Sequence, residues 1–385
     1  MSVHDSSCLD CAFYSAFDAT PRPPHKDTRP LLDITCLSES KTGNFMGVIL
    51  ALLPLVSQIR KLSLAVWGYA IWIAVYCFQL FVNSIIWYKN VDITIPVWCD
   101  IVTKLQTGAG IGTRICALVI CAKLYKVTRL RGSFEFSKEE KRKVVIYELL
   151  LIVAFPVLIM ALSVISQPFR FEIIEEEGCT TSVYSYVGYA IHYGPSLISS
   201  LACVILAPLT TRTFLRHRKE MKGFFSTSQE MTYNRYNRLM VIAYFDVLFN
   251  LPVLMVSLVT SILEGNKSPL NFPFKSWKNV HEGEGGNAPG LSLSSILQVP
   301  ANTWGMDTWG VFVVKWDEWL YVVHAIMFFC VFGTTPEMRR YYRNLFRFVP
   351  NRCGTRRVSD TDTLSDVQFI SNPDQRMESI PASLK

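Results

Sequence analysis

Charged side chains interrupt the long apolar stretches of this 385-residue chain, among them Asp100, Lys104, Arg114 and Asp246. A charge inside an apolar membrane segment is costly, so such residues are candidates for a functional site by default. Asp100 and Lys104 are four residues apart, which predicts either a mutual ion pair on a helix or part of a ligand-binding mouth. Arg114 and Asp246 each lie roughly 12–14 Å from the same membrane edge at 1.5 Å per helical residue. They could therefore pair across two helices and hold a resting conformation, or each could pair with other neighbours or water.

Pro252 divides the apolar stretch Leu239–Leu263, which also contains Asp246. A proline frees a backbone carbonyl and weakens a helix locally, so the same residue can serve as a hinge or as simple packing geometry. With Arg114 and Asp246 it forms our predicted conformational switch.

Catalytic chemistry is not expected from this chain. His192 and His324 are the histidines within or beside apolar stretches, and neither belongs to an H-x-x-x-H or G-x-S-x-G motif. Cys8 and Cys11 form a C-x-x-C pair without the second ligand pair that a zinc site needs. We therefore predict no enzyme, no catalytic residue, no metal site and no cofactor.

The residues above must be positioned by membrane helices. Half of the chain is apolar and only 18% is charged, which is typical of a membrane protein. Seven stretches are about long enough to cross a bilayer. They run over Asn44–Ile59, Leu62–Tyr88, Val97–Ala122, Val144–Ser166, Ser185–Thr210, Leu239–Leu263 and Trp319–Thr334. The sequence thus predicts an all-α bundle of seven transmembrane helices.

Lysine and arginine crowd into every second connection between these stretches, and cationic loops tend to stay cytoplasmic. The N-terminus is then outside and the C-terminus cytoplasmic. We expect a polar extracellular tail over 1–43, the bundle over 44–335 with a long third outer loop at 264–318, and a largely disordered cytoplasmic tail over 336–385. The net charge of +7 reflects these loops and indicates no nucleic-acid partner.

Two cysteines differ from those inside the apolar stretches. Cys99 stands at the outer mouth of the third stretch, and Cys179 lies in the loop after the fourth. Both are expected on the oxidising side of the membrane, which predicts a disulfide between them.

The segment Pro96–Leu105, which reads PVWCDIVTKL, resembles the start of the third span in fungal mating-pheromone receptors of the a-factor, lipopeptide-binding type. Other segments resemble further spans and outer loops of that family: Asn83–Trp87, Glu177–Cys179, Asp246–Pro252, Ser276–His281 and Phe328–Gly333. The chain departs from the family in its polar N-terminal tail and in Ser57-Gln58, where the family usually has W-H.

The resemblance implies a multi-pass plasma-membrane receptor that binds a farnesylated peptide and activates a heterotrimeric G protein through its Gα subunit. A seven-helix transporter or channel is the alternative, although the chain lacks the inverted half-repeat of many transporters. Membrane lipid is an expected partner. A homodimer, the identity of the pheromone and of the Gα subunit, glycosylation of Asn266 and phosphorylation of the C-terminal tail are left open by the sequence.

A lipidated ligand requires an apolar pocket with few polar anchors. The ligand-binding candidates around the outer mouth are Trp98, Asp100, Lys104, Glu175, Tyr186, Tyr189, His192, Trp316 and Tyr321. The aromatic members would serve equally well in an interfacial belt.

Cations at the opposite ends of the helices are candidates for the G-protein contact: Arg142, Lys143, Arg212, Arg216, Arg218, Lys219, Arg235 and Arg238. Cytoplasmic positive charge alone explains much of this pattern.

Overall fold

A computed structural model describes most of the chain. The described residues are 29–57, 63–129, 138–181, 183, 185–221, 227–267, 271, 273–282, 292–306, 308–336 and 338–344. The pair Cys8 and Cys11 and most of the two predicted tails lie outside these ranges, as do the side chains of Arg218, Lys219 and Arg235.

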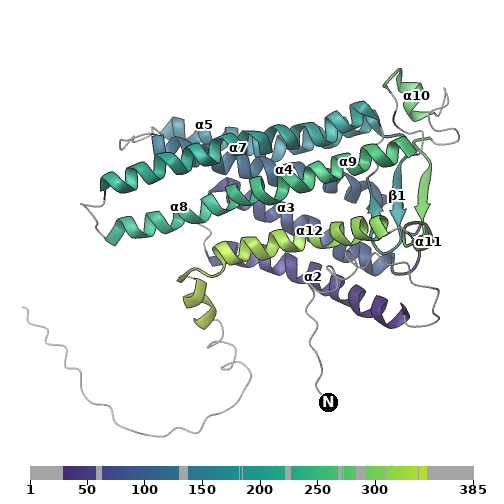
Figure 1. The fold of residues 1–385 in the computed structure, drawn as a ribbon, viewed down its shortest axis with the longest axis horizontal. Coiled ribbons are helices and arrows are strands. Elements are labelled where there is room, and N and C mark those ends of the chain that lie inside the picture. The colour runs from purple at the N-terminus through teal and green to yellow at the C-terminus, as the bar shows by residue number, and fades with distance from the viewer. Residues whose placement is uncertain are drawn as a thin grey trace, which may run out of the picture. The chain divides into compact units, whose positions relative to one another are not determined.

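Long helices that lie side by side make up most of the described chain (Figure 1). They are α2 (Arg29–Ser57), α3 (Leu64–Ile86), α4 (Pro96–Arg129), α7 (Tyr186–Met221) and α12 (Thr308–Phe332). Two further rods are composite. One runs from α5 (Lys138–Leu149) through the π-helix η1 (Leu150–Ala154) and α6 (Phe155–Leu162) to the 3-10 helix η2 (Ser163–Ser166). The other joins α8 (Thr227–Phe245), the π-helix η3 (Asp246–Asn250) and α9 (Leu251–Lys267).

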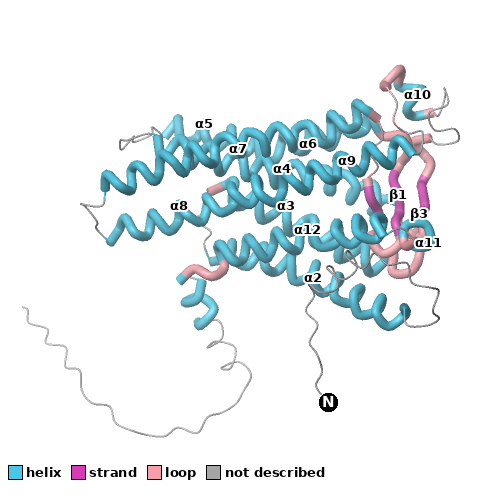
Figure 2. The backbone as a smooth tube through the Cα atoms, viewed as in Figure 1, coloured by secondary structure: helices cyan, strands magenta, loops and turns pink. Residues whose placement is uncertain are grey.

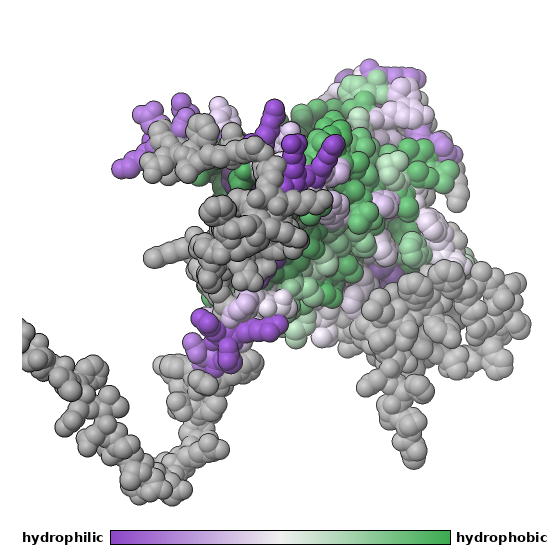
Figure 3. Space-filling view, turned by 60° about the vertical axis from the view of Figure 1, so that its left-hand side comes forward, coloured by the Kyte–Doolittle hydropathy of each residue, from purple (hydrophilic) through white to green (hydrophobic). Residues whose placement is uncertain are grey.

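Five helices in the described ranges are long and apolar enough to cross a membrane: Leu64–Ile86, Pro96–Arg129, Lys138–Ser166, Tyr186–Arg216 and Tyr236–Leu263. The first predicted span corresponds to a shorter apolar helix, Ser40–Val56. The last predicted span lies in α12, whose first half carries Lys315, Asp317 and Glu318. The structure is therefore that of a mostly helical, multi-pass membrane protein. Figure 3 shows the matching hydrophobic surface, in green, along the bundle.

Helix α4 occupies the centre of the bundle. In its most apolar window 72% of the residues are buried, against 22% for the rod that includes α5 and α6. Small residues allow this packing, because a Cβ added at Gly112 would lie 2.4 Å from Nε1 of Trp72 in α3. A Cβ at Gly108 would likewise lie 2.5 Å from Sδ of Met160 in α6. The peripheral rod instead exposes a row of large apolar side chains, as expected for contact with lipid: Val145, Leu149, Leu150, Val153, Val157 and Leu158.

A small three-stranded sheet covers one end of the bundle, which we call the sheet end (Figure 2). Strand β1 (Phe171–Ile174) pairs antiparallel with β2 (Gly178–Thr180) and parallel with β3 (Ile296–Val299), in the order β2-β1-β3. Gly178 makes the β1–β2 turn possible: its φ is +85°, and a Cβ there would lie 2.7 Å from Cβ of Asn83. The all-helical prediction did not anticipate this sheet, because strands of three or four residues carry no periodic signal.

The last long helix begins at Thr308 rather than at Trp319, so the predicted outer loop is shorter and more structured. It contains α10 (Trp277–His281), β3 and α11 (Ala301–Trp304). The charged turn of α12 is stabilised locally, since Lys315 Nζ lies 2.8 Å from Glu176 Oε2 and 3.3 Å from Glu318 Oε2. Compensated charges of this kind allow a helix to continue where hydropathy alone predicts a loop.

Candidate functional site

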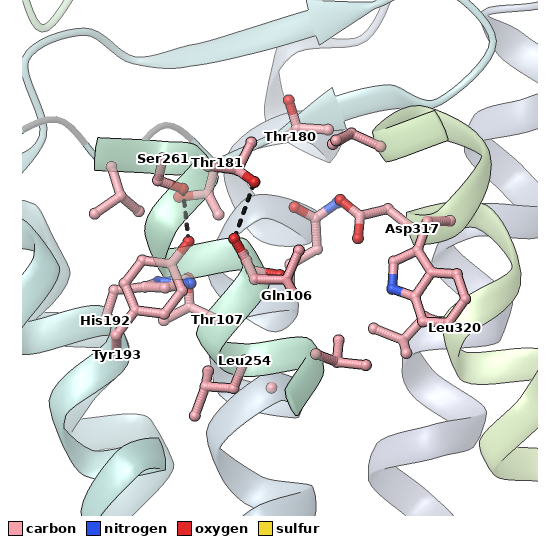
Figure 4. A pocket seen from close by; sticks show the side chains of 18 of the residues that line it. Gln106, Thr107, Thr180, Thr181, His192, Tyr193, Leu254, Ser261, Asp317 and Leu320 are labelled. Atoms are coloured by element: carbon pink, nitrogen blue, oxygen red, sulfur yellow. Dashed lines mark hydrogen bonds between the residues drawn. The ribbon is translucent and has the colours of Figure 1, made fainter. Parts of the chain in front are cut away.

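A cavity of about 540 Å³ lies directly beneath the sheet, between α4, α7, α9 and α12. This volume is within the range of small-molecule and ligand pockets. Figure 4 shows His192 and Tyr193 of α7 facing Asp317 and Leu320 of α12 across it. The cavity therefore draws its wall from segments that are far apart in the sequence.

The wall of the cavity combines aromatic and aliphatic side chains with polar ones. Tyr76 of α3 and Tyr321 of α12 stack with their ring centroids 3.7 Å apart. Phe312 and Trp316 stack along α12 with centroids 5.8 Å apart. Tyr193 is fixed by a hydrogen bond of 2.8 Å between its hydroxyl and Ser261 Oγ of α9 (Figure 4). Such a wall can surround an apolar group, while a few polar atoms orient it.

Helix α4 contributes the long side of the cavity. Gln106, Gly110 and Arg114 recur at four-residue intervals and all line it. At the sheet end, Gln106 Nε2 donates to the carbonyl of Cys179 at 2.7 Å. Arg114 lies eight residues further along the helix, about 12 Å at 1.5 Å per residue. The cavity thus reaches more than two helical turns from the sheet into the bundle.

The two ends of the cavity differ in charge. Glu172, Glu177 and Asp317 line the sheet end, whereas Arg114 lines the deep end. Burial raises the pKa of Glu177 well above its usual range, and the negative charges of Asp317, Glu318 and Glu172 raise it further, while Lys315 opposes them. A ligand in this cavity meets acidic groups near the sheet and a guanidinium at the floor.

Arg114 and Asp246 do not form an ion pair with each other in the described residues. Arg114 Nη1 donates to the carbonyl of Gly110 at 2.5 Å. Asp246 Oδ1 instead accepts from Asn250 Nδ2 at 3.0 Å, and Asn250 Oδ1 lies 2.7 Å from His324 Nε2. Asn250, one helical turn further along the same rod, therefore holds the carboxylate of Asp246 and links it to His324 of α12. The predicted contact between Arg114 and Asp246 is not part of this conformation.

The predicted pair of Asp100 and Lys104 is also absent, and each residue has another partner. Arg170 binds Asp100 in a bidentate manner, with Nε 2.9 Å from Oδ1 and Nη2 2.5 Å from Oδ2. Lys104 Nζ donates to Ser163 Oγ at 3.0 Å and to Gln167 Oε1 at 2.6 Å. The planar guanidinium matches a carboxylate better than an ammonium does, which explains the exchange of partners. Both residues connect α4 to the segment after α6 and do not line the cavity.

The sulfur atoms of Cys99 and Cys179 form a disulfide in the structure, with Cα atoms 5.3 Å apart. The bond joins α4 to β2. Around it, Trp87, Phe171 and Ile173 are completely or almost completely buried.

The remaining ligand-binding candidates divide into two groups. His192, Trp316 and Tyr321 line the cavity. The other four do not line it: Trp98, Glu175, Tyr186 and Tyr189. Trp98 Nε1 donates to Asn83 Oδ1, and Glu175 accepts from the amide of Ala301. Tyr189 is buried between helices, whereas Tyr186 is 57% exposed.

Several cavity residues escaped the sequence analysis, among them Gln106, Thr107, Tyr193 and Asp317. A helical pattern of polar residues on α4 ending at Arg114 could have identified Gln106 and Thr107. The contribution of Asp317 depends on where α12 begins, which hydropathy did not indicate.

The predicted cationic contacts lie at the helix ends remote from the sheet (Figure 1). Arg142, Lys143, Arg212 and Arg216 are exposed there, and Arg238 is half-buried. In the described residues no group of three or more histidine, cysteine, aspartate or glutamate side chains could hold a metal ion.

Comparison with known proteins identifies similar receptors. The model of the STE3 family, described as pheromone A receptor, matches residues 41–354. The chain is 29% identical over 302 residues to the pheromone B alpha 3 receptor of Schizophyllum commune, covering 78% of this chain and 46% of that protein. It is 25% identical over 325 residues to pheromone receptor 1 of Mycosarcoma maydis, covering 84% and 87% respectively. With the pheromone a factor receptor of Saccharomyces cerevisiae it shares 23% identity over 264 residues, covering 66% and 49%. The chain thus spans about half the length of several of these relatives.

Proposed function

The chain belongs to the pheromone A receptor family, and on this premise we propose that it binds a farnesylated peptide pheromone outside the plasma membrane and activates a heterotrimeric G protein inside. Its curated relatives are pheromone receptors, which supports a pheromone-sensing role. The ligand class and the coupling are our inference.

The observation that carries this proposal is the cavity of about 540 Å³ beneath the sheet. Its aromatic and aliphatic wall suits a prenyl chain, whose burial is worth about 0.8 kcal/mol per methylene. Its acidic end suits the peptide part, because the carboxylates of Glu172 and Asp317 favour cationic or hydrogen-bond-donating groups.

We assign the sheet end to the outside and seven spans to the bundle. To the five helices of sufficient length and apolarity we add Ser40–Val56 and α12, whose charged half lies at the sheet end. The disulfide between Cys99 and Cys179 at that end fits an oxidising compartment. The exposed cations at the other end fit the cytoplasmic side.

Activation would use the composite rod of α8, η3 and α9. Pro252, Val253 and Leu254 line the cavity, and they lie in the first turn of α9, just after the π-helix η3. A π-helical turn next to a proline is a common place for a helix to bend. A ligand that fits the bent form better would shift the population towards it and move α8 at the cytoplasmic side. Arg212, Arg216 and Arg238 then border the groove that we expect to accept the C-terminal helix of Gα.

The test is expression of the chain in a fungal strain that lacks its own pheromone receptor, followed by a panel of synthetic peptides with and without a farnesyl group. We expect GTP exchange on Gα only with farnesylated members of the panel. Equal responses to farnesylated and bare peptides would contradict the lipid-binding role. Solute flux through proteoliposomes without any peptide would instead favour a transporter.

A further inference from the structure

Arg114 is incompletely hydrogen-bonded although it lies deep in the bundle. A guanidinium carries five N–H donors in one plane. In the part of the chain that the structure describes, its hydrogen bond goes to the carbonyl of Gly110, and the buried Nε atom has no acceptor. A buried charged donor without an acceptor is unfavourable, so the conformation leaves Arg114 able to gain a partner.

Asp246, the residue that the sequence pairs with Arg114, does not supply this acceptor in the described residues. Its Oδ1 accepts from Asn250 Nδ2, while its buried Oδ2 has no hydrogen-bond partner and makes no ion pair with Arg114 in the described residues. Its carboxylate also faces Ser200 and Cys203 of α7. The guanidinium instead borders the cavity, where Gly110 leaves room: a Cβ at that glycine would lie 3.8 Å from both Arg114 Nη1 and the Tyr321 hydroxyl.

We propose that Arg114 binds an acceptor oxygen of the ligand, either a carboxylate or a carbonyl, next to the farnesyl group at the floor of the cavity. This inference rests on the proposed function and adds the orientation of the ligand. An acceptor would be repelled by the carboxylates of Glu172 and Asp317 near the sheet and attracted by Arg114 at the floor. The peptide's donors and cations face the sheet, and its acceptor end enters first.

The apolar surroundings make this contact selective. Ile111, Leu320 and Tyr321 also line the cavity, so water competes less for the guanidinium than at the surface. A ligand that lacks the acceptor leaves the guanidinium unpaired in the bound state. We expect it to bind about 10- to 100-fold more weakly.

The test measures binding of three small probes to the purified full-length chain in lipid nanodiscs. The probes are N-acetyl-S-farnesylcysteine as the free acid, its methyl ester, and N-acetyl-S-farnesylcysteamine, which lacks the carboxyl carbon. We expect the acid or the ester to bind more tightly than the cysteamine compound. Preference for the acid indicates recognition of a carboxylate, and equal binding of acid and ester indicates recognition of the carbonyl.

Arg114→Gln should abolish the preference, so that all three probes bind with similar affinity. The matched control is Lys104→Gln on the same helix, because Lys104 is bonded to Ser163 and Gln167 away from the cavity. This control should keep the preference. If Arg114→Gln does not fold, Arg114→Lys replaces it, because lysine keeps the charge without the planar fork. In this variant we expect either the preference for the ester over the cysteamine compound to be lost or the preference for the acid over that compound to be weaker.

Two results would overturn the inference and leave the proposed function standing: equal binding of all three probes by the unaltered chain, or unchanged preferences in Arg114→Gln or Arg114→Lys. Failure of the unaltered chain to bind any farnesylated probe would overturn the proposed ligand class, and this inference with it.

Discussion

The two ends of the cavity are built differently. At the sheet end, contacts are redundant: the disulfide, the bidentate pair of Asp100 with Arg170 and the contacts of Lys315 all connect different segments. At the floor, a π-helix replaces regular helix, Pro252 follows it, and Arg114 and Asp246 each retain a buried atom without a hydrogen bond. Redundant contacts fix one conformation, whereas unsatisfied groups beside an irregular helix allow a second one of similar energy. We infer a rigid lid above an adjustable floor.

Removal of the disulfide should have the largest effect, because it tests the rigidity of the lid directly. Cys99→Ser combined with Cys179→Ser should lower the free energy of unfolding by about 2–5 kcal/mol. The measurement is thermal unfolding of the purified protein together with antibody labelling at the cell surface. Cys330→Ser is the control, since Cys330 is an exposed free cysteine on α12. Equal stability of the two variants would show that the hydrogen bonds alone hold the lid.

Filling the cavity should impair ligand response without weakening the lid. Gly110→Leu places a large side chain in the cavity, where the glycine leaves space. We expect the peptide concentration for half-maximal response to rise about 10- to 100-fold, since overpacking commonly costs about 1–3 kcal/mol. Gly194→Leu on α7 is the matched control, because nothing lies within 4 Å of a Cβ at that position. Similar loss in both variants would mean that the effect comes from the helix and not from the cavity.

Neutralising the buried carboxylate of the floor should have a smaller effect, on the resting state. Asp246→Asn keeps the size of the side chain and changes its charge beside Asn250. If this carboxylate favours the resting conformation, basal GTP exchange without ligand should rise about three- to tenfold. The same exchange in the exposed-loop variant Asp92→Asn should match the unaltered chain. An unchanged basal rate in Asp246→Asn would show that the floor is held by other contacts.

The sequence predicted the membrane helices better than it predicted the contacts in the lid or at the floor of the cavity. Apolar stretches located the helices, because burial in lipid requires a continuous run of apolar residues. The lid was harder to predict. Its strands are three or four residues long, and Asp100 binds Arg170, which is 70 residues away in the sequence. At the floor, the sequence identified Arg114 and Asp246 as candidates but did not predict the residues to which they are hydrogen-bonded. Their contacts depend on helix rotation, which the π-helix η3 alters by inserting a wider turn.

The pH dependence of the lid provides the smallest and most specific test. The pKa of Glu177 in the folded state is raised above its ordinary value of 4.5, first by burial and then by Asp317, Glu318 and Glu172. The folded lid therefore favours the protonated form, and this contribution to stability is complete below pH 4.5 and is lost as pH rises through the higher folded value. Glu177→Gln mimics the protonated form.

We therefore expect the unfolding temperature of the unaltered chain to fall more steeply from pH 4.5 upward than that of Glu177→Gln, and this variant should be at least as stable as the unaltered chain at neutral pH. Glu282→Gln, at an exposed position after α10, should keep the slope of the unaltered chain. Identical slopes in the unaltered chain and in Glu177→Gln would mean that Lys315 compensates the carboxylate fully. In that case the charges of the lid would be balanced as well as its segments cross-linked. The lid and the floor would then differ more in how well their polar groups are satisfied than the burial of Glu177 suggests.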